Sequence, residues 1–315
     1  MAENRKRRKK SRAVSGWVNF DKPLGMGSTQ AVSKIRRLFD AQKAGHAGTL
    51  DPLASGILPI ALGEATKTVS FMQNAAKCYE VVIAFGSQTS TDDGEGEIIA
   101  SNNVRPDAAA VEAALPYFIG SVEQVPPQFS AIRKDGKRAY ALARAGEKVE
   151  LQPRVVHIDT ISVLEVLDEA QVRLKVECGK GVYIRSLARD LGRFLGAFAH
   201  VGALRRTRVG RFDEKTALGL EKLTALGHIA PDLAALDACL LPLETALDDI
   251  PALALSDDAA SCIKQGQAIS PSEPQILLAN KEGGEVLLTH QGKALAIARV
   301  GDGNGLLQPR RLFNL

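Results

Sequence analysis

The spacing of apolar residues predicts alternating strands and helices along most of the chain. Apolar and polar residues alternate over 79–85 and again over 172–178, which predicts two strands. Over 28–39 and 184–195 the apolar residues recur at helical spacing, with Ser28 as the expected N-cap of the first helix. The middle of the chain therefore combines both kinds of element.

The pattern changes after residue 250. Short apolar runs over 275–279, 286–289 and 294–300 are divided by glycines, and this texture predicts a small β-rich domain formed by residues 251–315. The stretch before it, 215–250, is expected to be helical or irregular. The chain is thus expected to hold a larger domain followed by a smaller one.

Composition agrees with a folded chain. It has 315 residues, of which 45% are apolar and 24% charged, so it can bury a core. No apolar run approaches the ~20 residues that cross a bilayer, and the N-terminus lacks the apolar stretch of a signal peptide, which predicts a cytoplasmic protein. Four scattered cysteines without a C-x-x-C pair indicate free thiols rather than a zinc site or a disulfide framework.

The net charge of +4 is unevenly distributed. Residues 1–12 hold seven Lys or Arg against one Glu and are expected to form a disordered basic tail, so the remainder sums to +4 − 6 = −2. Basic runs over 131–154 and 201–211 are candidate phosphate-binding patches, with solvated faces as the alternative. The acidic stretch 223–263 should face away from any RNA.

Two segments are rich in small or acidic residues. The acidic run 91–97 lacks the spacing of a calcium loop and is expected to be a solvated turn. The segment 45–56 is too punctuated by glycines for a regular element, and it exposes backbone around one carboxylate, Asp51. Pro52 disfavours helical geometry at Asp51. From composition alone, an aspartate in such a turn is expected to be a local cap.

The literal string changes that expectation. Residues 45–56 read Gly-His-Ala-Gly-Thr-Leu-Asp-Pro-Leu-Ala-Ser-Gly, which resembles the catalytic motif of TruB-type pseudouridine synthases and of their guide-RNA-dependent relatives. Further segments resemble that family in the expected order, namely 22–25, 63–67, 77–80, 126–140, 179–187 and 202–208. The resemblance is strong over about 16–212, and 306–311 is weakly similar to the close of a PUA domain.

The resemblance implies an α+β fold. The expected architecture is a mixed, largely antiparallel sheet flanked by helices and loops, spanning residues 13–250, with an RNA-clasping insertion at about 124–154. Residues 251–315 would form the small β-rich, PUA-like RNA-binding domain.

The resemblance also implies an isomerisation of uridine to pseudouridine, in which Asp51, Tyr79 and Arg185 are the expected catalytic residues. An ionised Asp51 would either attack C1′ or remove the C2′ proton, and Arg185 would favour its charged form. Tyr79 would present its ring to the uracil and is a possible acceptor of the C5 proton. A core aromatic and a surface ion pair are the alternative roles of Tyr79 and Arg185.

The substrate must unstack before its glycosidic bond can be attacked. His46 is expected to stack in the space vacated by the flipped uridine, with proton transfer as its second possible role, and Leu204 to pack on the target base. The other residues expected to bind substrate are Lys22, Gly48, Thr49, Lys67, Tyr183 and, on the insertion, Arg133, Lys134, Lys137 and Arg138.

The implied protein is a stand-alone monomer that modifies the T loop of tRNA, at position 55, with no metal, no cofactor and no membrane or obligate protein partner. Two alternatives remain. A guide-RNA-dependent synthase would need partners and usually has a longer PUA end, and a non-catalytic RNA-binding protein would not require all of Asp51, Tyr79 and Arg185.

Overall fold

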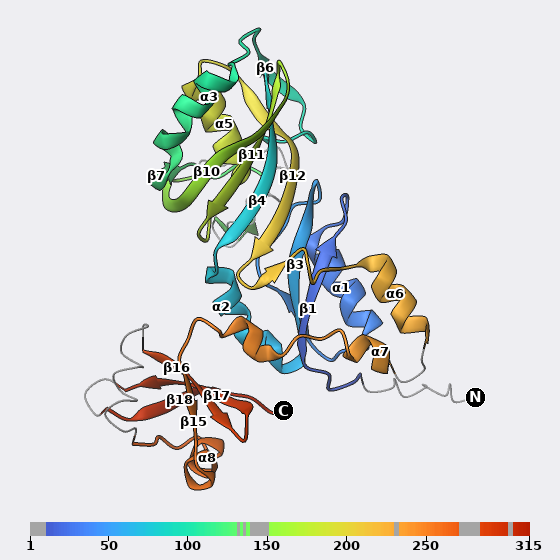
Figure 1. Ribbon diagram of the computed structural model, residues 1–315, viewed down its shortest axis with the longest axis vertical. Coiled ribbons are helices and arrows are strands. Elements are labelled where there is room, and N and C mark those ends of the chain that lie inside the picture. The colour runs from blue at the N-terminus through green and yellow to red at the C-terminus, as the bar shows by residue number, and fades with distance from the viewer. Residues whose placement is uncertain are drawn as a thin grey trace.

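The computed structural model describes residues 11–130, 133–134, 137–138, 151–229, 233–270, 284–301 and 305–315 (Figure 1). Within these ranges ten strands form one large sheet, and four strands near the C-terminus form a second. Two short antiparallel pairs complete the strands: β5 (Ser87–Thr89) with β6 (Ile98–Ser101), and β8 (Arg133–Lys134) with β9 (Lys137–Arg138).

The large sheet has the order β14-β1-β3-β12-β4-β11-β10-β7, with β13 beside β12 and β2 beside β3. Its strands are β1 (Gly16–Lys22), β2 (Ala44–His46), β3 (Ala54–Leu62), β4 (Lys77–Phe85), β7 (Gly120–Gln124), β10 (Arg154–Asp168), β11 (Gln171–Cys178), β12 (Ala199–Val209), β13 (Phe212–Asp213) and β14 (Leu218–Gly219). Only the pairs β1–β14 and β3–β12 are parallel. The expected mixed, largely antiparallel sheet is therefore confirmed.

Helices cover this sheet and connect its strands. They are α1 (Ser28–Leu38), η1 (Gly63–Thr68), α2 (Val69–Asn74), α3 (Ala108–Ala114), η2 (Leu115–Phe118), α5 (Ile184–Phe194), α6 (Leu220–Ile229), α7 (Ala234–Asp237) and η3 (Leu243–Ala246). In Figure 1, α1 and α6 lie beside the β1–β3 end of the sheet, whereas α3 and α5 lie beside its β10–β11 end. The strands expected over 79–85 and 172–178 correspond to β4 and β11, and the two expected helices to α1 and α5.

Both faces of the central strands are buried. On β1, Val18 packs in the core that contains Ile35 of α1, whereas its neighbour Trp17 points to the opposite face and contacts Phe212 with ring centroids 5.4 Å apart. Each large apolar side chain buried in this way contributes about 1.5–3 kcal/mol. Because β3 is held on both faces, the residue where it begins, Ala54, gives the preceding loop a rigid anchor.

The second sheet forms the C-terminal β-rich unit that the sequence predicts. Its order is β15-β16-β17-β18, formed by β15 (Ala252–Ala254), β16 (Glu285–His290), β17 (Lys293–Val300) and β18 (Leu307–Leu312), with α8 (Asp257–Lys264) packed against it. The strand expected over 275–279 lies outside the described residues.

The C-terminal unit docks on the segment that follows β3. Lys67 Nζ donates to the carbonyl of Leu312 at 2.6 Å, and the Asn314 amide donates to Glu64 at 2.8 Å. Phe313 and Leu287 join the core that lies on the Trp17 face of the large sheet. The end of the chain is therefore fastened to the larger domain by polar and apolar contacts together.

Some local expectations were wrong. The ends of segment 45–56, expected to lack regular structure, belong to β2 and β3. Of the segment expected to be a disordered tail, residues 1–10 lie outside the described residues, but Arg12 forms a bridge with Ala41 and an ion pair with Asp237. Ser28 is the first helical residue rather than the N-cap, which is Gly27.

Candidate active site

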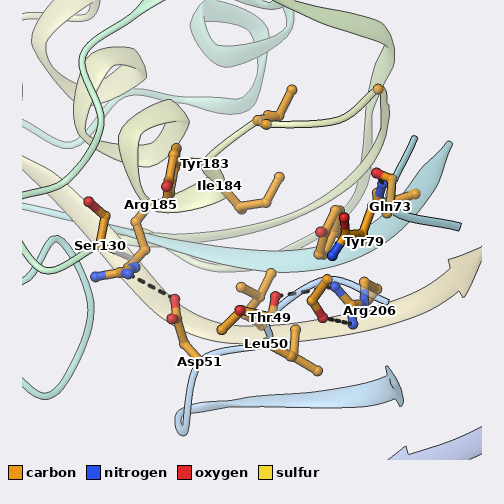
Figure 2. A pocket seen from close by; sticks show the side chains of 16 residues that line it. Thr49, Leu50, Asp51, Gln73, Tyr79, Ser130, Tyr183, Ile184, Arg185 and Arg206 are labelled. Atoms are coloured by element: carbon orange, nitrogen blue, oxygen red, sulfur yellow. Dashed lines mark hydrogen bonds and ion pairs between the residues drawn. The ribbon is translucent and has the colours of Figure 1, made fainter. Parts of the chain in front are cut away.

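Asp51 lies in the short connection between β2 and β3, where its side chain is 39% exposed. Its Oδ2 is 2.9 Å from Nη2 of Arg185, at the beginning of α5 (Figure 2). Two residues that are 134 positions apart in the chain thus form an ion pair. The structure places the carboxylate and the cation of the sequence-predicted pair in direct contact.

Arg185 is itself held by other acceptors. It is 6% exposed, and it donates to the carbonyl oxygens of Thr91 and Phe129, each at 2.9 Å. Asp93 Oδ2 lies 3.6 Å from its Nη1. An arginine fork satisfied on several sides has little freedom, so its edge toward Asp51 is preorganised.

The acidic turn 91–97 is solvated only in its second half: Gly94, Glu95 and Glu97 are exposed as expected, whereas the expectation was wrong for Asp92 and Asp93. Asp92 and Asp93 are 6% and 5% exposed, and Asp92 Oδ2 pairs with Arg189 Nη1 at 3.0 Å. Burial raises the pKa of Asp92, although the Arg189 guanidinium opposes this. The turn folds over α5 because two arginines one helical turn apart offer it countercharges, a pairing that local sequence cannot reveal.

The loop around Asp51 is fixed by side chains from two other elements. Ser28 Oγ donates to the Leu50 carbonyl at 2.7 Å and accepts from the Leu50 amide at 2.8 Å. Arg206 of β12 donates to carbonyls on both sides of Asp51. The hydroxyl expected to cap α1 therefore holds the residue next to Asp51 instead.

A cavity of about 270 Å³ opens beside this loop. Its lining consists of Gly48, Thr49, Leu50, Asp51, Gln73, Lys77, Tyr79, Ser130, Gly179, Gly181, Val182, Tyr183, Ile184, Arg185, Leu204 and Arg206 (Figure 2). Mixed apolar walls with a few convergent polar groups are typical of a small-molecule or nucleobase site.

Tyr79 forms part of the cavity wall from β4. Burial raises its pKa, although the nearby Arg206 guanidinium opposes this. The hydroxyl therefore stays protonated at neutral pH, and the ring offers an apolar face with a polar tip. Leu204, paired with Val81 on the neighbouring strand, adds aliphatic surface to the same cavity.

The N-terminal half of the chain matches the model of the TruB family pseudouridylate synthase N-terminal domain over residues 36–184, and residues 185–248 match the tRNA pseudouridylate synthase B C-terminal domain. The chain belongs to the TruB family of pseudouridylate synthases. Pseudouridine synthases are isomerases, so the reaction class of this chain is an isomerisation rather than a redox or hydrolytic one.

Relatives in this family are similar over nearly the whole of this chain. The tRNA pseudouridine synthase B of Rhodopseudomonas palustris is 51% identical over 99% of this chain and 84% of its own length. That of Caulobacter vibrioides is 51% identical over 98% of this chain and 99% of its own. Among solved structures, a chain in the crystal structure of a Cbf5-Nop10-Gar1 complex has a TM-score of 0.72 at 25% identity, covering 95% of this chain and 85% of that one. The pseudouridine synthase fold is therefore established.

Not every residue expected at the TruB-type site lines the cavity. Gly48, Thr49 and Tyr183 do, whereas Lys22 and His46 lie outside its lining. Lys22 is buried and donates to the carbonyls of Pro23 and Met26, and burial lowers its pKa to about 8. Burial also lowers the pKa of His46, with Arg206 adding to the effect, so its ring is neutral at pH 7.

The remaining expected residues are not among those that line the described cavity. Lys67 holds the C-terminal strand β18 rather than lining the cavity. On the insertion, the backbone of β8 and β9 is described, but the side chains of Arg133, Lys134, Lys137 and Arg138 lie outside the described residues. Their predicted contacts with RNA remain predictions.

The basic run 201–211 is not the unopposed positive surface that the sequence suggests. Arg205 pairs with Asp21 and Glu214, while Arg208 and Arg211 have carboxylate partners on neighbouring segments. The fourth arginine, Arg206, is buried. Acids distant in sequence neutralise the run, which a local charge count does not show.

Four polar side chains of the cavity lining were missed from the sequence: Gln73, Lys77, Ser130 and Arg206. Lys77, Ser130 and Arg206 stand inside segments that resemble the family, and this is the signal that could have pointed to them. Among the described residues no group of three or more potential metal ligands is found, and no helix is long and apolar enough to cross a membrane.

Proposed function

We propose that the protein converts the uridine at position 55 in the T loop of tRNA into pseudouridine, without a guide RNA or a protein partner. The observation that carries this proposal is the Asp51–Arg185 pair at the edge of a cavity walled by Tyr79. The names of the full-length relatives, tRNA pseudouridine synthase B, support tRNA as the substrate.

The reaction breaks the bond between N1 and C1′, turns the uracil, and joins C5 to C1′. Asp51 acts at the sugar, either by attacking C1′ to form an ester or by removing the C2′ proton to give a glycal. Both routes release the uracil as an anion. As C5 joins C1′, either the ester bond to Asp51 breaks or the proton held by Asp51 returns to C2′ of the glycal; the C5 proton then leaves to solvent while N1 gains one. Arg185 orients the carboxylate for either route.

The base must leave the RNA stack to reach this cavity. Tyr79 and Leu204 provide a ring face and an aliphatic surface between which a flat pyrimidine can lie. His46, neutral and close to the loop, fills the space that the uridine vacates. The basic residues of the insertion, from Arg133 to Arg138, grip phosphates on the outer face of the RNA.

The rest of the chain supports this chemistry. Residues 13–250 form the catalytic domain, preceded by a basic tail at residues 1–10, and residues 251–315 form a PUA-like RNA-binding domain. The protein acts as a monomer in the cytoplasm, where tRNA is matured. It needs no metal or cofactor, because the isomerisation involves no net oxidation or reduction.

The test is release of tritium from a T-arm RNA labelled at uracil C5, with purified protein and nothing else. Wild-type protein should release tritium, whereas Asp51→Asn should release none and still bind RNA. The matched control is Asp21→Asn, because Asp21 is similarly exposed and also pairs with an arginine, Arg205, at 2.9 Å. Equal loss in both variants would make Asp51 structural.

The same assay separates the second candidate. The structural likeness to a chain crystallised with Nop10 and Gar1 makes a partner-dependent synthase worth testing. If the wild-type protein released no tritium alone but did so after addition of a guide RNA and partner proteins, the partner-dependent synthase would replace the stand-alone proposal.

A further inference from the structure

Arg206 is the most deeply buried cation of the described cavity lining. Its side chain is 1% exposed, and it lies on β12 between β3 and β4. Within the described part of the chain it forms no ion pair with a carboxylate; its guanidinium donates to three backbone carbonyls and also hydrogen-bonds the side chain of Tyr79. A charge buried in this way is costly, so its presence calls for an explanation other than stability.

Its neighbours increase that cost. The Arg206 charge contributes to lowering the pKa of both Lys22 and Lys77, the second of which falls to about 8 mainly through burial. Like charges in a poorly solvated region repel one another. A buried charge placed beside two lysines is typical of a group retained for a functional site.

The contacts of Arg206 span the loop that carries Asp51. Nη2 donates to the Gly48 carbonyl at 3.2 Å and Nη1 to that of Thr49 at 3.4 Å, both before Asp51. Nε donates to the Ile57 carbonyl at 2.8 Å, after Asp51. One planar group therefore holds both ends of the loop, as the dashed lines on the Arg206 side of Figure 2 partly show.

The backbone of Arg206 extends this fixation to Tyr79. In the sheet, Arg206 is the register partner of Gly56 on β3 and of Tyr79 on β4. The approach to β3 is close: a Cβ at Gly56 would lie 2.2 Å from the Arg206 carbonyl oxygen, and Gly56 has a φ of +103°. The chain thus brings Arg206 as near to the loop as backbone atoms allow.

We propose that Arg206 is a positioning residue, which fixes the Asp51 loop at a set distance from Tyr79 so that carboxylate and ring meet the same nucleotide. Arg206 acts through the loop backbone, and its guanidinium is already engaged before substrate arrives. The proposal rests on the proposed function, because it assigns the spacing between two groups of that site. Misplacement of a reacting group by about 1 Å costs on the order of 100-fold in rate.

The test compares Arg206→Lys with Arg205→Lys. The lysine keeps the charge at 206 but cannot span carbonyls on both sides of the loop. The control changes the adjacent arginine on the same strand, whose partners are Asp21 and Glu214. Rates of tritium release are corrected for the folded fraction found by thermal unfolding.

For Arg206→Lys, kcat should fall about 100-fold while KM for the T-arm RNA stays within about threefold, and the control should keep kcat within about threefold. Three results would overturn the proposal: an unchanged kcat in folded Arg206→Lys, an equal loss in the control, or a raised KM with normal kcat. Inactivity of the wild type would instead refute the proposed function, so the two failures are distinct.

A measurement on the unaltered protein covers the case in which Arg206→Lys does not fold. In protein labelled with ¹⁵N-arginine, the Arg206 Nε–H should exchange with solvent far more slowly than that of an exposed arginine such as Arg211, because it is bonded to the Ile57 carbonyl. Exchange as fast as at Arg211 would show that the loop is not held, and would refute the proposal without any substitution.

Discussion

Arg185→Lys is the substitution that most directly tests the arrangement around Asp51. Arginine at this position meets two carboxylates and two carbonyls, at distances from 2.9 to 3.6 Å. Lysine keeps one positive charge but presents it from a single nitrogen with three donors. It cannot reach acceptors that surround a planar fork on several sides.

The size of the effect follows from those contacts. A hydrogen bond to a charged group contributes about 1.5–3 kcal/mol. If the substitution removes one such bond to Asp51 in the transition state, kcat falls by about 10- to 100-fold, since each 1.4 kcal/mol changes a rate about tenfold. RNA affinity should change little, because Arg185 is buried and contributes little to the electrostatic surface.

The assay is single-turnover tritium release from the labelled T-arm RNA, with RNA binding measured separately on filters. The matched control is Arg189→Lys, four residues along the same helix and equally buried, with Asp92 and Asp190 as partners and no contact with Asp51. Both variants should lose thermal stability, but only Arg185→Lys should lose rate. A rate within threefold of wild type for folded Arg185→Lys would refute this account of the site.

Three further predictions concern loop anchoring, pH and salt. Ser28→Ala removes two buried hydrogen bonds to Leu50 and should lower kcat roughly tenfold at unchanged KM; a wild-type rate would show that the loop holds itself. Burial lowers the pKa of Lys77 to about 8, below its ordinary value of 10.5, so the unfolded state binds more protons between these two pH values. Wild-type stability relative to Lys77→Met should therefore rise from about pH 8 to pH 10.5 and be flat below pH 8, as followed by thermal unfolding; a falling difference would contradict the sign. Deletion of residues 1–10 should weaken RNA binding at low salt and leave it nearly unchanged at high salt, because the tail offers only screened attraction; equal loss at both would indicate specific contacts.

The strands and helices that could be predicted were those whose periodicity is strong. The alternation over 79–85 and the helical spacing over 184–195 are properties of neighbouring residues, and the structure places β4 and α5 there. The string at 45–56 could likewise be recognised from the sequence, because the residues of this loop are contiguous in the chain. It indicated both the family and Asp51. What could be predicted was local.

The features that escaped prediction depend on residues far apart in the chain. The first half of the acidic turn is buried because Arg185 and Arg189 reach it from a helix more than 90 positions later. Ser28 was expected to cap its own helix, but it bonds to Leu50 instead. Arg206 appeared as one member of a basic run until the sheet placed it beneath the Asp51 loop. In each case a contact between residues distant in the chain decided the structure, and such a contact cannot be read from a local stretch of sequence.

The register between β7 and β10 also has a consequence for engineering. Gln124 and Arg154, which flank the insertion, are direct partners across two antiparallel strands. The chain therefore leaves the sheet and returns to it at a single rung, and the Gln124 side chain is tied in addition to the Tyr183 backbone. An insertion taken from a relative can be grafted between these two positions without changing the spacing of its attachment points. The graft must keep Phe129, whose carbonyl holds Arg185, and Ser130 of the cavity lining, so only the part of the insertion after Ser130 can be exchanged without altering the active site.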